Sequence, residues 1–339
     1  MTIVGNGSPQ GVQITPRLPR RLTPGREPSD WIFHGLATTV GLSVLAVTGA
    51  IGLFLGYQSI PTLRHYGWHF FTQSNWLPEL NQIGIAAVLV GTAEVALIAM
   101  FVSFPLALMF ALFITDYAPP RIKSWLVSAV DLMAAVPSII YGLWGFFLLQ
   151  PHAIDVARWL SQYLGWLPIF HVDTDPNAAV WQQSSYTGSA FIAGLAVSMM
   201  AIPLACAVMR AVFDQAPLGE REAAMALGGT RFGVARTVVL PFAKGGIIGG
   251  TMLALGRALG ETAAVLIIIS PEYLIKARIL EAGTQTISAL IAANFGDATT
   301  SQLSALLTAG FVLFLITLTV NTCAAVVIRR SRSGASTDI

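Results

Sequence analysis

The sequence predicts an all-α membrane protein with six transmembrane helices. Of its 339 residues, 55% are hydrophobic and only 11% are charged, whereas soluble domains usually have about 25% charged residues. A helix needs about 20 apolar residues to cross the hydrocarbon core of a bilayer. Six stretches satisfy this requirement, namely 32–55, 85–114, 125–149, 189–209, 245–269 and 303–327. An ordinary soluble fold is therefore excluded, and the net charge of +2 gives no reason to expect a nucleic-acid partner.

Three of the predicted spans contain a proline. The long second span contains Pro105, so we expect a tilted or kinked helix rather than two elements. Pro137 and Pro203 lie within the third and fourth spans, where neighbouring helices can satisfy the carbonyl groups that a proline leaves without a donor. Each span is thus expected to remain a single element.

The basic residues of the connecting segments predict the orientation of the chain. The tails and loops on one side carry 14 Arg and Lys residues, and those on the other side carry four. Because basic residues favour the cytoplasmic side, both termini are expected in the cytoplasm. Residues 1–31 are rich in Pro, Gly and Arg and are expected to form a disordered tail, and 328–339 form a second tail. The loops 57–84 and 150–188 carry tryptophans typical of a membrane interface: Trp68, Trp76, Trp159, Trp166 and Trp181.

The sequence contains no motif for catalysis or for binding ATP. A Walker loop needs a lysine after glycine, but the three lysines, Lys123, Lys244 and Lys276, follow Ile, Ala and Ile. There is also no H-E-x-x-H zinc motif and no G-x-S-x-G nucleophile motif. We therefore expect no catalytic residue, no metal site and no cofactor on this chain. Cys206 and Cys323 lie in apolar stretches and are expected to be small core residues.

The loop 210–244, between the fourth and fifth spans, carries the strongest local pattern. Ala, Glu, Met and Leu favour a short helix over about 219–227, and Gly228-Gly229 can end it. Thr230 can cap a second short helix that stops at Pro241. Two helices joined by a glycine turn would protrude into the cytoplasm, where small alanine side chains allow close approach to a groove on another protein.

The residues of this loop resemble the signature of ABC importer permeases. The matching positions are Glu222, Ala223, Ala224, Gly228, Val238, Leu240 and Pro241. The resemblance implies a MetI-like permease fold, in which this loop forms the coupling helices that dock into a cleft of an ATP-binding subunit. It also implies that ATP is hydrolysed on that separate subunit, which agrees with the missing Walker loop.

The fifth span contains two charged residues one helical turn apart. Arg257 lies at its centre, and Glu261 can pair with Arg257 on one face of a continuous helix. Because an arginine at the bilayer midplane is costly, Arg257 is expected to face protein or a water-filled pathway. In the functional interpretation, Arg257 attracts an oxyanion that crosses the membrane. Glu261 then holds the Arg257 side chain in place or balances its charge between transport events. The alternative is a static salt bridge that stabilises the helix bundle.

Glycines on the fifth span predict a close contact with another helix. Four of them fall within a narrow band around the helix axis, and such a stripe permits close packing: Gly245, Gly249, Gly256 and Gly260. Arg257 and Glu261 project beside this stripe. The span is therefore expected to pack on one side and to line a pathway on the other.

Three stretches narrow the resemblance to phosphate-specific permeases. They are 253–263 (Leu-Ala-Leu-Gly-Arg-Ala-Leu-Gly-Glu-Thr-Ala), 134–145 (Ala-Ala-Val-Pro-Ser-Ile-Ile-Tyr-Gly-Leu-Trp-Gly) and 291–297 (Ile-Ala-Ala-Asn-Phe-Gly-Asp). Together these stretches resemble the PstC-type subunit more than they resemble its PstA-type partner. The likeness extends over about 80–327 and leaves the N-terminal tail and the loop 150–188 unmatched.

This resemblance implies a permease domain over 32–327 in the plasma (inner) membrane of a prokaryote. It further implies a complex with a PstA-type permease, two PstB-type ATPases and an external PstS-type phosphate-binding protein. Phosphate would be the transported substrate, and ATP and magnesium would be bound by the ATPase.

Two other acidic residues lie inside predicted spans. Glu94 departs from the pattern of the phosphate permeases, and a structural, internally hydrogen-bonded role is favoured over a role in transport. Asp131 lies toward the cytoplasmic side of the third span and is interpreted as a helix-packing or gate-network residue. Both are candidates for a pathway or gate.

Other functions remain open on the sequence alone. The chain could instead be the PstA-type subunit, or a permease for another oxyanion such as sulfate or molybdate. A less favoured alternative is an ion-coupled secondary transporter in which Arg257, Glu261 and Glu94 form a charge relay. An intramembrane enzyme has no motif in its support.

Overall fold

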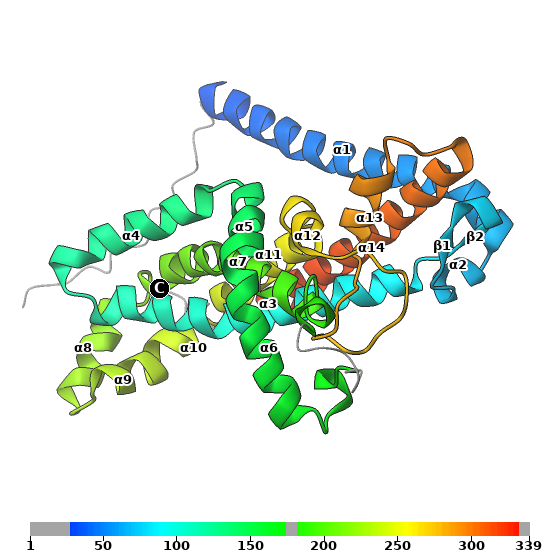
Figure 1. Cartoon of the computed structure of the whole chain (residues 1–339). Coiled ribbons are helices and arrows are strands. Elements are labelled where there is room, and N and C mark those ends of the chain that lie inside the picture. Colours follow the sequence, from blue (N-terminus) through cyan, green and yellow to red (C-terminus); the bar gives the residue numbers. More distant parts are fainter. Residues whose placement is uncertain (1–27, 174–181, 332–339) are drawn as a thin grey trace, which may run out of the picture. The chain divides into compact units, whose positions relative to one another are not determined.

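The computed structural model describes residues 28–173 and 182–331 (Figure 1). Most of the predicted N-terminal tail, residues 332–339 and Trp181 therefore lie outside the described residues. The chain divides into two compact units, 1–51 and 52–339, and the boundary falls within α1 (Pro28–Tyr66). The described part of the first unit is the N-terminal portion of this single helix. Every contact described below lies within the second unit.

The second unit is built almost entirely of helices. The end of α1 is followed by α2 (His69–Thr72), β1 (Trp76–Leu77), β2 (Gln82–Ile83), α3 (Ala86–Leu112), α4 (Pro120–Ala135), α5 (Ser138–Trp144), α6 (Gln150–Leu164), α7 (Ala190–Phe213), α8 (Leu218–Ala226), α9 (Arg231–Val234), α10 (Leu240–Phe242), α11 (Lys244–Leu259), α12 (Ala263–Ile268), α13 (Ile287–Asn294) and α14 (Thr300–Ser331). π-Helical turns extend or join several helices, at Phe113–Tyr117, Gly145–Leu149 and Ala235–Val239. β1 and β2 form a short antiparallel hairpin in which Trp76 lies opposite Ile83.

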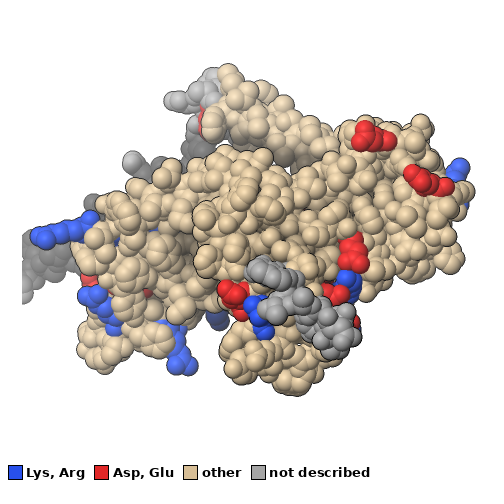
Figure 2. Space-filling view, viewed as in Figure 1, with Lys and Arg blue, Asp and Glu red and all other residues tan. Residues whose placement is uncertain are grey.

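The fold class predicted from the sequence is confirmed. Within the described residues, five helices are long and apolar enough to cross a membrane, namely Asp30–Tyr66, Ala86–Tyr117, Ser138–Leu164, Ala190–Phe213 and Thr300–Ile328. A sixth candidate is the pair Arg231–Phe242 and Lys244–Leu259, whose helices are bent by 73°. The chain is a multi-pass membrane protein. Figure 2 shows the matching surface, most of which carries no charged side chain, while Lys and Arg gather near α8 and α9.

The third predicted span is wrong in its position. We expected one helix over 125–149, but α4 ends at Ala135 and a new helix begins at Ser138. Pro137 explains the break, because a proline disfavours the helical conformation of the residue before it, and Val136 is extended with ψ 132°. The Tyr141 hydroxyl donates to the Met133 carbonyl at 2.8 Å and satisfies a group freed by the break. The membrane-length segment continues through α6 to Leu164, into what we had assigned to the loop 150–188.

The core of the second unit lies between α3 and α7, which make the most extensive helix contact. Small side chains on both helices are buried here, including Ala96 and Ala99 on α3 and Ala193 on α7. Gly194 permits the closest approach, because a Cβ at this position would lie 2.6 Å from Ile98 Cγ2. Cys206 is buried in a second core cluster on α7, whereas Cys323 is exposed on α14, so its predicted place in the core is wrong.

The close glycine contact of α11 differs from the predicted stripe. Cβ atoms at Gly246 and Gly250 would meet α7, with Val212 Cγ2 at 2.4 Å and the Ala205 carbonyl at 3.2 Å. By contrast, a Cβ at Gly249 would meet only Ile328 Cδ1 on α14, at 3.5 Å. A Cβ at Gly256 would likewise meet α14, with Asn321 Oδ1 at 3.7 Å. The predicted stripe therefore faces another helix, as expected, whereas the tighter contact, with α7, is made by Gly246 and Gly250 and was not predicted.

Replacing Gly246 by alanine is expected to destabilise the protein by about 1–3 kcal/mol, because the new methyl group overlaps the rigid branch of Val212. The matched change Gly249→Ala places a methyl group in ordinary van der Waals contact and is expected to be neutral or stabilising by less than about 1 kcal/mol. Thermal unfolding of the detergent-solubilised variants measures the difference. Equal stability of the two variants would contradict the assigned α7 contact.

Candidate functional site

The loop between α7 and α11 forms an elbow of two short helices, defined here as residues 218–234. The predicted helix is confirmed as α8, and Gly228 ends it with φ +84°, a conformation that suits glycine. Thr230 caps α9, as predicted, with Oγ1 accepting a hydrogen bond from the Gly233 N–H at 3.1 Å. The second helix does not stop at Pro241, however. It continues to Phe242, and the sharp bend follows at Ala243.

The elbow exposes an apolar surface together with the signature residues. Leu227 at its tip is 90% exposed, and three further large apolar side chains are also exposed: Leu218, Met225 and Phe232. Among the signature residues, Glu222 and Ala223 are exposed, and Ala224 is half-buried. Leu240 is half-buried and Pro241 is exposed at the base of the elbow. An exposed apolar patch bordered by charged residues is typical of a protein interaction site.

Ion pairs join the helices at this end of the molecule. Arg221 of α8 donates from Nη1 to Asp116 Oδ1 at 2.7 Å and from Nη2 to the Phe213 carbonyl at 2.5 Å. Asp131, a predicted gate residue on α4, accepts a hydrogen bond from Arg210 of α7 at 3.3 Å. Asp131 therefore links α4 to α7. Sequence reasoning missed the pairing of Arg221 with Asp116, because 105 residues separate them.

The fifth span is interrupted between Arg257 and Glu261. α11 ends at Leu259 and α12 begins at Ala263, so the predicted continuous helix is wrong. The Glu261 side chain accepts a hydrogen bond from the Ala264 N–H at 3.2 Å and supports the first turn of α12. Its own carbonyl accepts from Ser288 Oγ at 2.6 Å. Glu261 is only 7% exposed and serves the broken helix rather than pairing with Arg257.

Arg257 remains exposed near the end of α11. Within the described part of the chain, its guanidinium makes no hydrogen bond and no ion pair, and its charge acts on the Tyr141 hydroxyl of α5. The predicted static pair between Arg257 and Glu261 is thus not formed among the described residues. An exposed arginine on an apolar helix needs a partner protein or water beside it.

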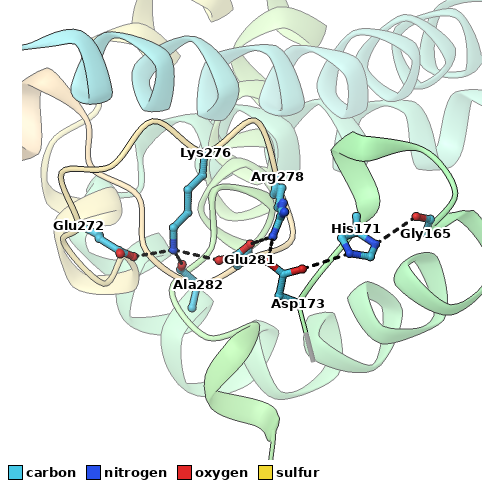
Figure 3. A network of polar contacts seen from close by, with 8 residues as sticks. All are labelled: Gly165, His171, Asp173, Glu272, Lys276, Arg278, Glu281 and Ala282. Carbon is cyan, nitrogen blue, oxygen red and sulfur yellow. Dashed lines mark hydrogen bonds and ion pairs between the residues drawn. The ribbon is translucent and has the colours of Figure 1, made fainter. Parts of the chain in front are cut away.

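A second cluster of charges lies at the other end of α3, on the segment that we call the strap, residues 270–286 between α12 and α13. Figure 3 shows its members reaching toward one another from the strap and from the loop after α6. Lys276 Nζ lies 2.8 Å from Glu272 Oε2 and 3.0 Å from Glu281 Oε1. Arg278 pairs with both Glu281 and Asp173, and Asp173 also contacts His171. The network joins the strap to residues 165–173.

Glycines allow the strap to fold closely onto its neighbours. Gly283 has φ +92°, and a Cβ there would overlap the Glu272 carboxylate. Gly91 of α3 has no room for a side chain either, because a Cβ would lie 2.3 Å from the Gln285 carbonyl. The Thr92 hydroxyl of α3 accepts a hydrogen bond from the Ile287 N–H at 3.0 Å, where α13 begins. The strap therefore lies directly on α3.

Glu94 lies on α3 beside this network. It lines the same small cavity as Lys276, Arg278 and Glu281. No hydrogen bond or ion pair of Glu94 occurs among the described residues, so the predicted internally hydrogen-bonded role is not seen. The local sequence gave only a weak indication of the network, in the turn-like spacing of Glu272 with Lys276, and none of its contact with Asp173.

Asp173 and Lys276 of this network keep their charges across neutral pH. The hydrogen bond from Arg278 holds the pKa of Asp173 below its ordinary value of 3.8, so its stabilising effect is present above that value and is lost as the pH falls further. Burial acts to lower the pKa of Lys276, but hydrogen bonds to Glu272 and Glu281 raise it overall. The contribution of Lys276 is therefore present below its ordinary value of 10.5 and is lost at higher pH.

The membrane-length helices and the protruding elbow with its exposed apolar side chains suit a component of a membrane transport system. Residues 103–333 match the family described as binding-protein-dependent transport system inner membrane component. The chain belongs to this family and is a permease component of such a system.

Curated relatives resemble the chain over most of its length, and this confirms the resemblance to PstC-type permeases. It is 37% identical over 293 residues to the phosphate transport system permease protein PstC of Xylella fastidiosa strain Temecula1, covering 86% of this chain and 88% of that protein. It is 36% identical over 297 residues to phosphate transport system permease protein PstC 2 of Mycobacterium tuberculosis strain H37Rv, covering 86% and 90%.

A solved structure shares the fold. It is a crystal structure of a bacterial ABC transporter involved in the import of the acidic polysaccharide alginate. The TM-score is 0.53 at 17% identity, and the match covers 89% of this chain and 96% of that chain.

Proposed function

We propose that this chain is the PstC-type permease subunit of an ATP-driven ABC importer of inorganic phosphate, and that it forms the translocation pathway with a second, PstA-type permease. The names of the relatives support phosphate as the substrate. The observation on this chain that carries the proposal is Arg257, which is exposed on a membrane helix and has no ion-pair partner among the described residues. Its guanidinium presents forked hydrogen-bond donors and a permanent charge, which suit an oxyanion.

In this proposal the two charged residues of the fifth span have different roles. Arg257 faces the pathway and attracts the anion, whereas Glu261 holds the break between α11 and α12 that positions Arg257. Tyr141 of α5 packs against the buried cluster that contains Ala258, the residue after Arg257. Asp131 and Glu94 lie toward opposite ends of the pathway, at the α4–α7 ion pair and beside the strap.

The elbow supplies the coupling surface. Glu222, Ala223, Ala224 and Gly228, with Leu240 and Pro241 at its base, dock into a cleft of a PstB-type ATPase. Two such ATPases bind ATP and Mg²⁺, and this chain holds neither. The elbow and both termini face the cytoplasm, in agreement with the excess of basic residues on that side. A PstS-type binding protein delivers phosphate to the opposite side.

The alternatives are less well supported. The curated relatives cited above carry the name PstC rather than PstA. A charge relay in an ion-coupled transporter would need Glu94 near Arg257 and Glu261, but Glu94 shares its cavity with residues of the strap.

Replacing Arg257 by glutamine is expected to lower ATP-dependent phosphate uptake by about tenfold or more, because hydrogen bonds to a charged group contribute roughly 1.5–3 kcal/mol. Uptake is measured with the complete complex in proteoliposomes. The control is Arg158→Gln, which removes another exposed arginine, on α6, and is expected to transport like the wild type. Wild-type uptake by an assembled Arg257→Gln complex would contradict the pathway role.

Replacing Gly228 by aspartate is expected to reduce stimulation of the ATPase by about fivefold or more, because the left-handed turn that closes α8 becomes strained and the elbow loses its docking shape. The matched change Gly296→Asp lies in open space near α13 and should leave stimulation unchanged. Full stimulation of an assembled Gly228→Asp complex would count against docking by the elbow.

A further inference from the structure

One side chain fastens the elbow to the two central helices. Arg221 lies on α8, and its fork reaches Asp116 and the Phe213 carbonyl. Asp116 lies in the π-helical turn that continues α3, and Phe213 is the last residue of α7. Since α3 and α7 form the core of the unit, Arg221 connects the elbow to the most extensively packed helices of the molecule.

The other main contacts of α8 stay within the same loop. The elements that it packs against most are α9 and the π-helical turn Ala235–Val239. Apart from Arg221, the side chains of α8 are exposed or half-buried, and Leu218 and Met225 face outward. A displacement of α8 therefore has a direct route to α3 through the contact of Arg221 with Asp116.

The Arg221–Asp116 pair differs from the neighbouring surface pair. The side chains of Arg221 and Asp116 are 15% and 11% exposed, whereas those of Lys123 and Asp214 are 35% and 47% exposed. Exposed pairs contribute little because water screens them. A buried pair resists separation, since removing one partner leaves an uncompensated charge in a poorly solvated place. The half-buried Arg221–Asp116 pair is thus the less screened and more rigid connection of the two.

The junction also has unused hydrogen-bonding groups. Asp116 Oδ2 and Arg221 Nε are buried without a hydrogen-bond partner among the described residues, as is Thr115 Oγ1. All three residues line a cleft of about 600 Å³ between α8 and the segment after α3. The ion pair therefore borders open space on one side, and its own hydrogen bond holds α8 to the segment after α3.

We propose that Arg221 is a positioning residue that transmits movement of the elbow to α3 and α7 through Asp116 and the Phe213 carbonyl. The inference rests on the proposed coupling function and names the link by which docking at the elbow reaches the membrane helices. Arg221 acts through these contacts and touches neither substrate nor nucleotide.

The test compares the double variant Arg221→Gln/Asp116→Asn with the wild type in the complete reconstituted complex. The neutral pair retains hydrogen-bonding groups and leaves no buried ion unpaired, which protects folding. The exposed apolar face of the elbow is unchanged, so ATPase binding is expected to persist and ATP hydrolysis to stay within about twofold. Uptake is expected to fall about tenfold, which raises the ATP hydrolysed per phosphate at least about fivefold. Arg221→Lys keeps the charge but lacks the fork and should be intermediate.

The matched control is Lys123→Gln/Asp214→Asn, which removes the exposed pair at the same end of the molecule. This variant should hydrolyse as much ATP per transported phosphate as the wild type. The inference would be overturned if the Arg221→Gln/Asp116→Asn complex hydrolysed as much ATP per transported phosphate as the wild type. It would also be overturned if this complex lost its ATPase subunits. If the wild-type complex itself takes up no phosphate, the proposed function fails instead.

A second readout does not depend on the substrate. Spin labels at Glu220 on the elbow and Leu97 on α3 occupy exposed positions outside the proposed docking residues. If Arg221 links the two elements, the distance between the labels stays the same in the wild-type complex when ATP and vanadate trap the closed ATPase. In the double variant the distance shifts or broadens. A shift in the wild type equal to that in the variant would overturn the inference.

Discussion

Side-chain hydrogen bonds at helix breaks hold this fold together. A bilayer offers no water to the backbone groups that a break exposes, so the protein must supply partners for them. At Pro137 the Tyr141 hydroxyl donates to the Met133 carbonyl. At the break after Leu259, the Glu261 carboxylate accepts from the Ala264 N–H, and Ser288 donates to the Glu261 carbonyl. These hydrogen bonds allow pairs of short helices to replace a single continuous helix in the membrane.

The breaks also position the groups that we assign to function. The helix that begins after Pro137 packs Tyr141 against the cluster that contains Ala258, the residue after Arg257. Because α11 ends before Glu261, the Glu261 side chain bonds to the backbone of α12 and does not pair with Arg257. Arg257 is thereby left without a counterion among the described residues. A 73° bend near Ala243 makes the helix that ends at Phe242 point in a different direction from α11. The hydrogen bonds of Arg221 connect the elbow to α7 and to the turn that continues α3.

Much of this could be predicted from the sequence because it depends on local pattern. Hydropathy identified the membrane helices, and Gly228 with Thr230 predicted the turn and cap of the elbow, since left-handed φ and N-capping are properties of single residues. Arg257 was recognised as unusual because charge is rare in a span. Pro137 was read as tolerated within a helix, although it ends one, because the choice depends on whether a neighbour such as Tyr141 can satisfy the freed carbonyl.

Contacts between distant residues could not be predicted in the same way. Asp116 with Arg221, and Asp173 with Arg278, are each 105 residues apart, so no period or motif relates them. The tight contact of α11 with α7 was missed for the same reason, because Gly246 matters only where Val212 lies opposite. Cys323 sits in an apolar stretch yet is exposed, since a membrane helix can be apolar on faces that the protein does not cover.

The most direct test is the structure of the complete complex with its ATPases trapped by ATP and vanadate. The account predicts that Leu227 and Phe232 of the elbow are buried against the ATPase, and that Arg257 borders a solvated passage between this chain and the second permease. An elbow that remains exposed, together with Arg257 packed against protein on all sides or facing lipid, would contradict it.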